Sequence, residues 1–351
     1  MVTPAQKKLP AMKTHRINFV IGFLSATALW QSAVTLHAAI PLVTLETVPI
    51  GNINNPLDPT DNLGAVSYPY VIGKYDVTVN QYVAFLNAVA KIPKNPAVTV
   101  LWKKSMQFPL PYVSPGLISR TGTGLVASPY VYAEMHDSNL GANSGNRPIC
   151  DISWFSAARF ANWMHNGATN GADTEHGAYT LAGHTTVTGQ TIGVIQKNPG
   201  AKWWIPTENE WYKAAYYDPS FWDTNTAGYG GYHDYPTMSD EPNIPVPEPP
   251  PGGTNSANFS GVMTDGLKLT AVGAYSNTHS YYGAYDMAGL LWEWTDGITS
   301  DSNAHPANRI MRGGSWSLGL LTVHRFSPRD YPPDYDDDDS GFRLSGLPPA
   351  P

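Results

Sequence analysis

The sequence predicts an α+β domain in which short strands and a few helices are joined by long loops. Gly and Pro number 32 and 31 among 351 residues, which is typical of a turn-rich chain rather than a helical bundle. Trp and Tyr number 11 and 20, and such aromatic side chains can hold a loop-rich core together. The net charge of −7 argues against nucleic acid as a partner, because that ligand needs a basic face.

Residues 1–39 are predicted to be a signal peptide. A basic start that includes Lys7, Lys8 and Arg16 precedes an apolar stretch, 17–30, which is short for a membrane span. We therefore expect a secreted, periplasmic or cell-surface protein without a membrane span after signal cleavage. An uncleaved anchor is the alternative interpretation, and Met12 is an alternative start. The predicted domain covers residues 40–346 and leaves a tail at 347–351.

Three helices are predicted from their capping residues and apolar spacing. Thr78 can cap a helix over 79–90, and Ser153 can cap a second helix over 154–166. Thr207 and Glu210 have the spacing of a capping box, which predicts a third helix and a structural role for Glu210.

The segments between these helices are predicted to be short strands and loops. We expect strands at 68–72 and 147–154, and weak hairpins around 130–132 and 179–181. The stretch 217–256, with its proline run at 246–251, is predicted to be a surface loop. The single cysteine, Cys150, permits no internal disulfide and is predicted to be a small core residue.

The stretch 285–344 holds the most distinctive acidic and aromatic residues. In an extended segment Trp292 and Trp294 share one face, so that Glu293 is held next to a core. A carboxylate there needs a cation or backbone donors as a partner. Glu293 is therefore either a structural carboxylate or a calcium ligand.

Six sequence blocks occur in an order that resembles the formylglycine-generating enzyme, or sulfatase-modifying factor, domain. They are Asp76-Val77-Thr78, Ser153-Trp154, Pro206 to Trp211, Tyr285 to Trp294, Arg312-Gly313-Gly314-Ser315 and Gly341-Phe342-Arg343. The resemblance covers about residues 43–345 and is greatest for an exported bacterial subgroup. It implies a C-type-lectin-like fold with little regular structure.

The resemblance also implies two structural calcium sites. One maps to Asp286, Gly289, Leu291 and Glu293. The other maps to the side chains of Asn258 and Asp265 and the backbone oxygens of Phe259 and Leu267.

The catalytic part of the family's pattern is missing. Leu318 and Val323 stand where the family has its copper-binding cysteines, and a copper(I) centre needs such thiolates. We therefore expect no copper and assign no catalytic residue. A non-haem iron centre, as in a related branch, needs about two histidines and a carboxylate together, whereas the histidines here are scattered.

The resemblance and these departures together predict a calcium-stabilised, non-catalytic binding module. The segment 317–339 would be the surface for an unknown peptide, protein or glycan, with its aromatic and cationic side chains as contacts: Trp316, His324, Arg325, Arg329, Tyr331 and Tyr335. The acidic run 334–339 is interpreted as a solvated loop or as a shallow site for calcium or a cationic ligand. The alternative function is a metal-dependent oxidase that acts on a peptide or small thiol.

Overall fold

The computed structural model describes residue 1 and residues 42–107, 116–137, 142–186, 195–223, 228–262, 268–299 and 308–349. The predicted signal peptide lies outside the described residues apart from Met1. The fold below belongs to the compact unit 39–351. Within the described ranges, no helix has the length and apolar character needed to cross a membrane.

The three predicted helices are confirmed as α1 (Val79–Val89), α3 (Trp154–His165) and α4 (Glu208–Tyr216). Thr78 and Thr207 each form a capping box with the side chain three residues later, and the Ser153 hydroxyl accepts a hydrogen bond from the Ser156 amide. Three shorter helical turns are present as well: α2 (Pro96–Thr99), η1 (Lys104–Met106) and η3 (Leu320–Val323).

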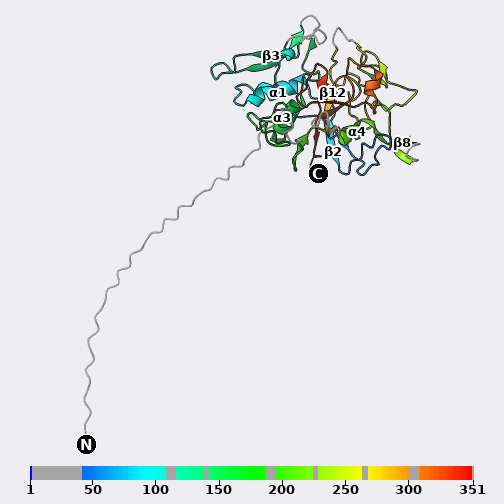
Figure 1. The fold of residues 1–351 in the computed structure, drawn as a ribbon, viewed down its shortest axis with the longest axis horizontal. Coiled ribbons are helices and arrows are strands. Elements are labelled where there is room, and N and C mark those ends of the chain that lie inside the picture. Colours follow the sequence, from blue (N-terminus) through cyan, green and yellow to red (C-terminus); the bar gives the residue numbers. More distant parts are fainter. Residues whose placement is uncertain are drawn as a thin grey trace. The chain divides into compact units, whose positions relative to one another are not determined.

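Aromatic side chains join α1 to α3 at the centre of the main core. The ring of Phe85 lies 5.3 Å from the rings of both Phe160 and Trp163, in edge or tilted contacts that suit aromatic pairs. Figure 1 shows the two helices side by side, in agreement with these contacts. Cys150 is buried in the same core, as predicted.

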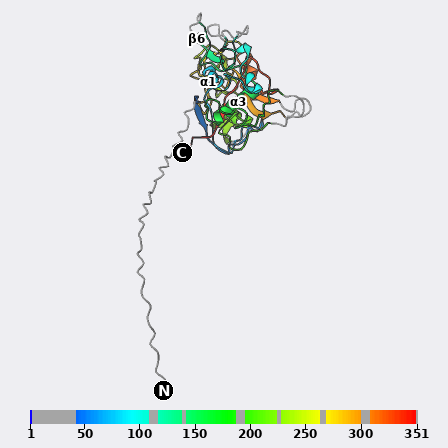
Figure 2. The same ribbon diagram turned by 90° about the vertical axis from the view of Figure 1, so that its left-hand side faces the viewer.

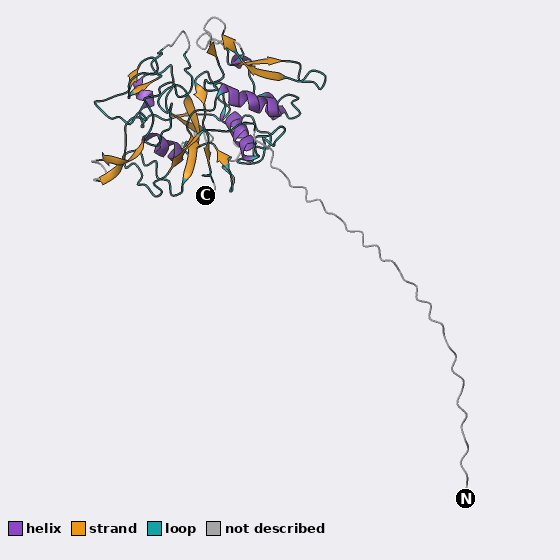
Figure 3. Cartoon of the chain, turned by 180° about the vertical axis from the view of Figure 1, so that it is seen from behind, coloured by secondary structure: helices purple, strands orange, loops and turns teal. Residues whose placement is uncertain are grey.

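Two four-stranded sheets lie between the α1–α3 pair and α4 (Figure 3). One has the order β14-β13-β12-β15, with bounds Arg329–Tyr331, Arg309–Arg312, Trp292–Ile298 and Ser340–Gly341. The other has the order β1-β2-β16-β7, with bounds Thr47–Ile50, Tyr70–Gly73, Ser345–Gly346 and Trp203–Trp204. Strands from both ends of the described domain therefore meet in one sheet (Figure 2).

The described residues also form four two-stranded pairs. They are β3 (Ile118–Thr121) with β4 (Val131–Glu134), β5 (His136–Asp137) with β6 (Ala142–Asn143), β8 (Tyr217–Asp223) with β9 (Gly228–Tyr232), and β10 (Val246–Pro247) with β11 (Ser256–Ala257). The β3–β4 pair confirms the hairpin predicted around 130–132. The many short strands and few helices agree with the predicted α+β class.

Three predictions of local structure were wrong. The stretch 217–256 is not all loop, because β8 and β9 pair across an irregular register that accommodates Pro219. Residues 147–154 form no strand and make one isolated bridge, Thr78 to Pro148, because Asp151 adopts a left-handed backbone (φ 60°) that ends the extended run. Around 179–181 the described residues make only the bridge between His176 and Thr180.

Candidate functional site

Glu293 on β12 lies at the centre of a buried group of charges. β12 is an inner strand of its sheet, and Glu293 is as buried as Trp292 and Trp294 on either side. Arg343 donates hydrogen bonds to both carboxylate oxygens of Glu293, with Nη2 2.7 Å from Oε1 and Nε 2.5 Å from Oε2. The indole Nε1 of Trp211 donates to Oε2 at 2.9 Å. Glu293 thus has a cationic partner within the chain, in the two-pronged geometry that suits a guanidinium.

Two further carboxylates belong to this group. Asp76 Oδ1 lies 3.4 Å from Arg343 Nη2, and Asp286 Oδ2 accepts a hydrogen bond from the Gly273 amide at 2.6 Å. Burial, together with the charge of Glu293, raises the pKa of Asp76 well above its usual range and that of Asp286 to about 6. Three carboxylates thus face one guanidinium, which leaves two negative charges uncompensated when all three are ionised.

The second predicted calcium site begins at Asn258, directly beside the first. Asn258 pairs with Gly289 in an isolated bridge. A Cβ on Gly289 would clash with the backbone carbonyl oxygen of Asn258, so that this close approach requires glycine. The side-chain Oδ1 of Asn258 is buried and has no hydrogen-bond partner among the described residues. Phe259 is buried next to it, whereas Asp265 and Leu267 lie outside the described residues.

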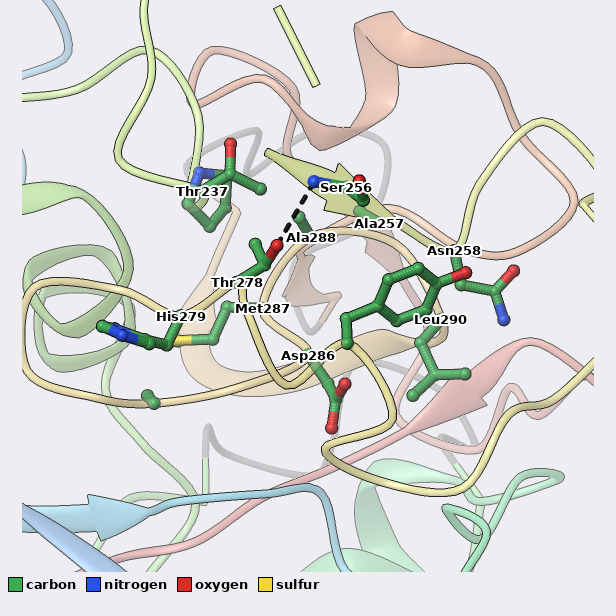
Figure 4. Close-up of a pocket in the computed structure, with 13 residues that line it drawn as sticks. Thr237, Ser256, Ala257, Asn258, Thr278, His279, Asp286, Met287, Ala288 and Leu290 are labelled. Carbon is green, nitrogen blue, oxygen red and sulfur yellow. Dashed lines mark hydrogen bonds between the residues drawn. The ribbon is translucent and has the colours of Figure 1, made fainter. Parts of the chain in front are cut away.

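A small cavity links the two predicted calcium sites. Its volume is about 20 Å³, enough for one water molecule or ion, and Asn258 and Asp286 line it from separate loops (Figure 4). Asp286 and Leu290 have left-handed backbones, each with φ 62°, which turn this loop tightly before β12 begins. The structure therefore places Asn258 directly beside Gly289 and places Asp286 on the wall of the same cavity as Asn258.

The six side chains of the predicted ligand surface fall into three groups. The ring of His324 lies 3.7 Å from the ring of Phe326 in a tilted contact, while Arg325 is held in ion pairs with Asp58 and Asp234. Burial lowers the pKa of His324, although Asp234 lies nearby. Ion pairing on both sides occupies Arg325, which makes it a structural residue as well as a candidate contact.

The other two groups lie around buried indoles. Tyr331 and Tyr335 stack in parallel at 3.9 Å, both half-buried, and the guanidinium of Arg329 lies 4.9 Å from the Trp292 ring. Trp316 is almost fully buried under the Lys268 ammonium, 4.3 Å from the ring. The parallel tyrosine pair and Arg329 are half-buried, as are His324 and Arg325, so that these five side chains are partly accessible whereas Trp316 is not.

The acidic run lies against the start of α3. Carboxylate oxygens of Asp337, Asp338 and Asp339 come within 4.8 Å of one another, and no other group of three acidic, histidine or cysteine side chains in the described ranges is as close. Lys103 pairs with Asp336. Burial and the neighbouring carboxylates raise the pKa of Asp338 to about 6. The run is therefore partly buried and partly compensated, rather than a fully solvated loop.

Sequence reasoning missed two groups of charged residues. Asp76 was noted only as part of a family block, and its partner Arg343 is 267 residues away, so that spacing offered no signal. His233 lies between Asp240, at 2.6 Å from Nδ1, and Asp218, at 3.5 Å from Nε2. Histidines that appear scattered in sequence can be found in such clusters only from the fold.

Comparison with known proteins identifies the family. The model of the sulfatase-modifying factor enzyme 1-like domain matches residues 58–345. The chain belongs to this family. The family and the fold class that the sequence blocks predicted are both confirmed.

Curated relatives in the family include two proteins named hercynine oxygenase. The relative from Mycolicibacterium smegmatis is 30% identical over 137 residues, which are 33% of this chain and 27% of the relative. The relative from Mycobacterium tuberculosis is 30% identical over 131 residues, 32% of this chain and 25% of the relative. The alignment thus spans only about a quarter of the length of these relatives.

Similar solved structures include CarF and Treponema denticola variable protein 1. CarF is 20% identical with a TM-score of 0.47, and covers 87% of this chain and 98% of its own. The variable protein is 18% identical with a TM-score of 0.46, and covers 88% of this chain and 98% of its own.

Apolar side chains occupy the two positions at which the family resemblance places copper-binding cysteines. Val323 is fully buried in a second hydrophobic cluster with Tyr235, Ala257, Phe259 and Ala288. Leu318 is half-buried and packs against the main core. Cys150 belongs to that main core rather than to this cluster, and burial raises the pKa of its thiol well above the usual range.

Proposed function

We propose that this family member is an exported, calcium-stabilised binding module without the family's copper chemistry. The observation that carries the proposal is the packing of Val323 and Leu318. Val323 fills an apolar cluster, and neither side chain can supply the thiolate that copper(I) requires. Export rests on the basic and apolar pattern of residues 1–39.

Calcium fits the charges of the buried group around Glu293. When all three carboxylates are ionised, they and the one guanidinium leave two uncompensated negative charges, which one divalent ion would neutralise. Oxygen donors are the ligands that calcium prefers. Asp286 and Glu293, with backbone oxygens of Gly289 and Leu291, would hold one ion. Asn258, whose buried Oδ1 has no partner among the described residues, would hold the other with Asp265, Phe259 and Leu267.

The ligand surface is proposed to centre on Tyr331, Tyr335 and Arg329. Flat aromatic and guanidinium groups bind peptides and glycans at little cost in conformational entropy. The rings of Tyr331 and Tyr335 are already stacked on each other. His324 and Arg325 would form a second part of the surface, and Trp316 would support it from within. The acidic run at 334–339 would favour a ligand with positive charge.

An oxidase remains the second candidate, because the similarity to hercynine oxygenases favours it. Metal analysis of the purified mature protein separates the two functions. Stoichiometric calcium without copper or iron supports the binding module, whereas one redox metal per chain, or conversion of a sulfatase peptide's thiol to an aldehyde, overturns it.

A glycan and peptide array tests the ligand surface directly. Tyr335→Ala, which removes half of the stacked pair, should reduce binding of any captured ligand at least tenfold. Tyr281→Ala is a matched control, because Tyr281 is an exposed tyrosine outside 317–339. Equal binding by wild type and Tyr335→Ala would contradict the placement of the surface.

A further inference from the structure

The turn of the β3–β4 hairpin exposes apolar side chains to solvent. Leu125 is 66% exposed and Val126 81%, and Val131 on the following strand is 53% exposed. The turn is closed by a hydrogen bond from the Ser128 amide to the Leu125 carbonyl oxygen at 2.9 Å. Tight turns favour Gly, Pro, Asn, Asp and Ser, so that the turn itself does not explain Leu and Val at these positions. Exposed apolar residues that cluster in this way, rather than lie scattered, indicate a contact surface.

The segment that carries this turn is basic, although the chain as a whole is acidic. Residues 77–133 contain no Asp or Glu, whereas the net charge of the chain is −7. The basic residues of the segment are Lys91, Lys94, Lys103, Lys104 and Arg120. Asp336 from outside the segment pairs with Lys103, while Lys91 and Lys94 are exposed.

The basic residues lie beside the hairpin. The Tyr130 amide donates to the Lys91 carbonyl oxygen at 2.9 Å, which holds the residues after α1 against the start of β4. The guanidinium of Arg120 lies 3.6 Å from the ring of Trp102 and 4.3 Å from that of Tyr130. Figure 1 shows the hairpin and α1 next to each other at one edge of the domain, in agreement with their contacts. Apolar and cationic groups are thus presented together.

An anionic lipid bilayer is the partner that this combination fits. Apolar side chains can enter the boundary between headgroups and acyl chains, while neighbouring lysines and arginines bind anionic headgroups. A protein partner fits less well, because a single turn buries far less than the roughly 800 Å² that each side of a stable interface needs. A soluble polyanion would use the cations but leave Leu125 and Val126 in water.

We propose that the β3–β4 hairpin docks the domain on an anionic lipid bilayer, with Leu125 and Val126 inserted at the lipid interface. The ammonium groups of Lys91 and Lys94 then lie at the headgroups. This contact is peripheral, since the turn reaches only the outer part of one leaflet. The inference goes beyond the proposed function and is independent of the calcium sites and of the ligand surface at 317–339.

Co-sedimentation with lipid vesicles tests the proposal. The chain from residue 40 onward is used, because the apolar stretch 17–30 would bind lipid by itself and the compact unit begins at residue 39. We expect binding to vesicles of equal parts phosphatidylglycerol and phosphatidylcholine, and at least tenfold weaker binding to phosphatidylcholine alone. A chain that does not bind the mixed vesicles would overturn the proposal.

Two double variants separate insertion from charge. Leu125→Ser with Val126→Ser should lower the partition constant for mixed vesicles at least tenfold, because the inserted apolar area is lost. Lys91→Gln with Lys94→Gln should also lower the partition constant for mixed vesicles, but leave that for phosphatidylcholine unchanged. If the serine variant binds mixed vesicles as tightly as wild type, the contact is purely electrostatic and insertion is excluded.

Ile53→Ser with Leu57→Ser is the matched control, because these two apolar residues are also exposed but lie outside the hairpin. This variant should bind as wild type does, and an equal loss of binding would remove the special role of the hairpin. A fluorophore provides a second measurement. Cys150 is the only cysteine and is buried, so that Val126→Cys can be labelled at the turn alone. The emission of an environment-sensitive dye there should shift to shorter wavelength on mixed vesicles, whereas unshifted emission from vesicle-bound protein would rule out insertion.

Discussion

Three of the buried arginines are each paired with a carboxylate on another element of the fold. Arg343 pairs with Glu293, Arg312 with Glu208 and Arg309 with Asp296. Removing one member of such a pair would leave a buried charge alone, at a cost of about 3–5 kcal/mol. The pairs therefore favour one arrangement of the loops over compact alternatives, which matters in a domain with short strands.

His233 should make the stability of the domain depend on pH. Burial lowers its pKa, but the hydrogen bonds and charges of Asp240 and Asp218 outweigh burial, and the net shift is upward. The Phe221 ring packs on the imidazole at 4.3 Å and adds no charge. Because the folded pKa exceeds the unfolded value of about 6.5, the stabilisation is complete below that pH and is lost as the pH rises through the folded pKa.

Urea unfolding of wild type and His233→Asn checks this pH dependence. We expect wild type to exceed the variant by about 1.5 kcal/mol more at pH 5.5 than at pH 9, because a charge-assisted hydrogen bond is lost at high pH. A stability difference that stays constant with pH would show that His233 does not titrate in this range.

At the scale of elements, the helix caps are the features that the sequence predicts most directly. Thr207 and Glu210 close a capping box at α4, and Glu210 also accepts hydrogen bonds from Tyr68 and Trp204. Sequence spacing alone predicted this box, since both partners lie within one turn of the same helix.

Thr207→Ala should destabilise the domain by about 1 kcal/mol, because the Glu210 amide loses its acceptor. The measurement is the midpoint of urea unfolding. Thr123→Ala is the control, since its hydroxyl lies exposed in the turn of the β3–β4 hairpin and should change stability by less than about 0.5 kcal/mol. Equal effects of the two substitutions would exclude a capping role.

Strands were predicted less well than helices, for a physical reason. The β8–β9 hairpin includes Pro219, a residue that is unfavourable inside a strand, and the register shift that accommodates it becomes visible only once both strands are placed. The reverse error at 147–154 arose because an extended segment needs a neighbour to become a strand, and this one has a single bridge. Similarly, Glu293 could be predicted to need a partner, but the choice of Arg343 depends on packing between distant segments.

At the scale of the whole molecule, β16 holds one sheet together. Ser345 pairs with Ile72 on β2 and with Trp204 on β7, so that this short strand lies between two segments that are far apart in sequence. A deletion of residues 345–351 would expose the edges of both neighbours.

That deletion should cost more than about 3 kcal/mol, because it removes hydrogen bonds on both sides of the strand. Near-ultraviolet circular dichroism would report the loss of fixed aromatic packing. A deletion of residues 348–351 alone is the control and should leave the spectrum unchanged, since it retains the bond from the Leu347 amide to the Lys202 carbonyl. A native spectrum for the longer deletion would contradict the role of β16.

The place of β16 also bears on how the chain is made. This sheet cannot close during synthesis until β16 has been made, because β16 is the last of its four strands in chain order and lies between β2 and β7. The sheet that joins the two ends of the described domain is therefore completed only after the residues of the other described strands have been synthesised.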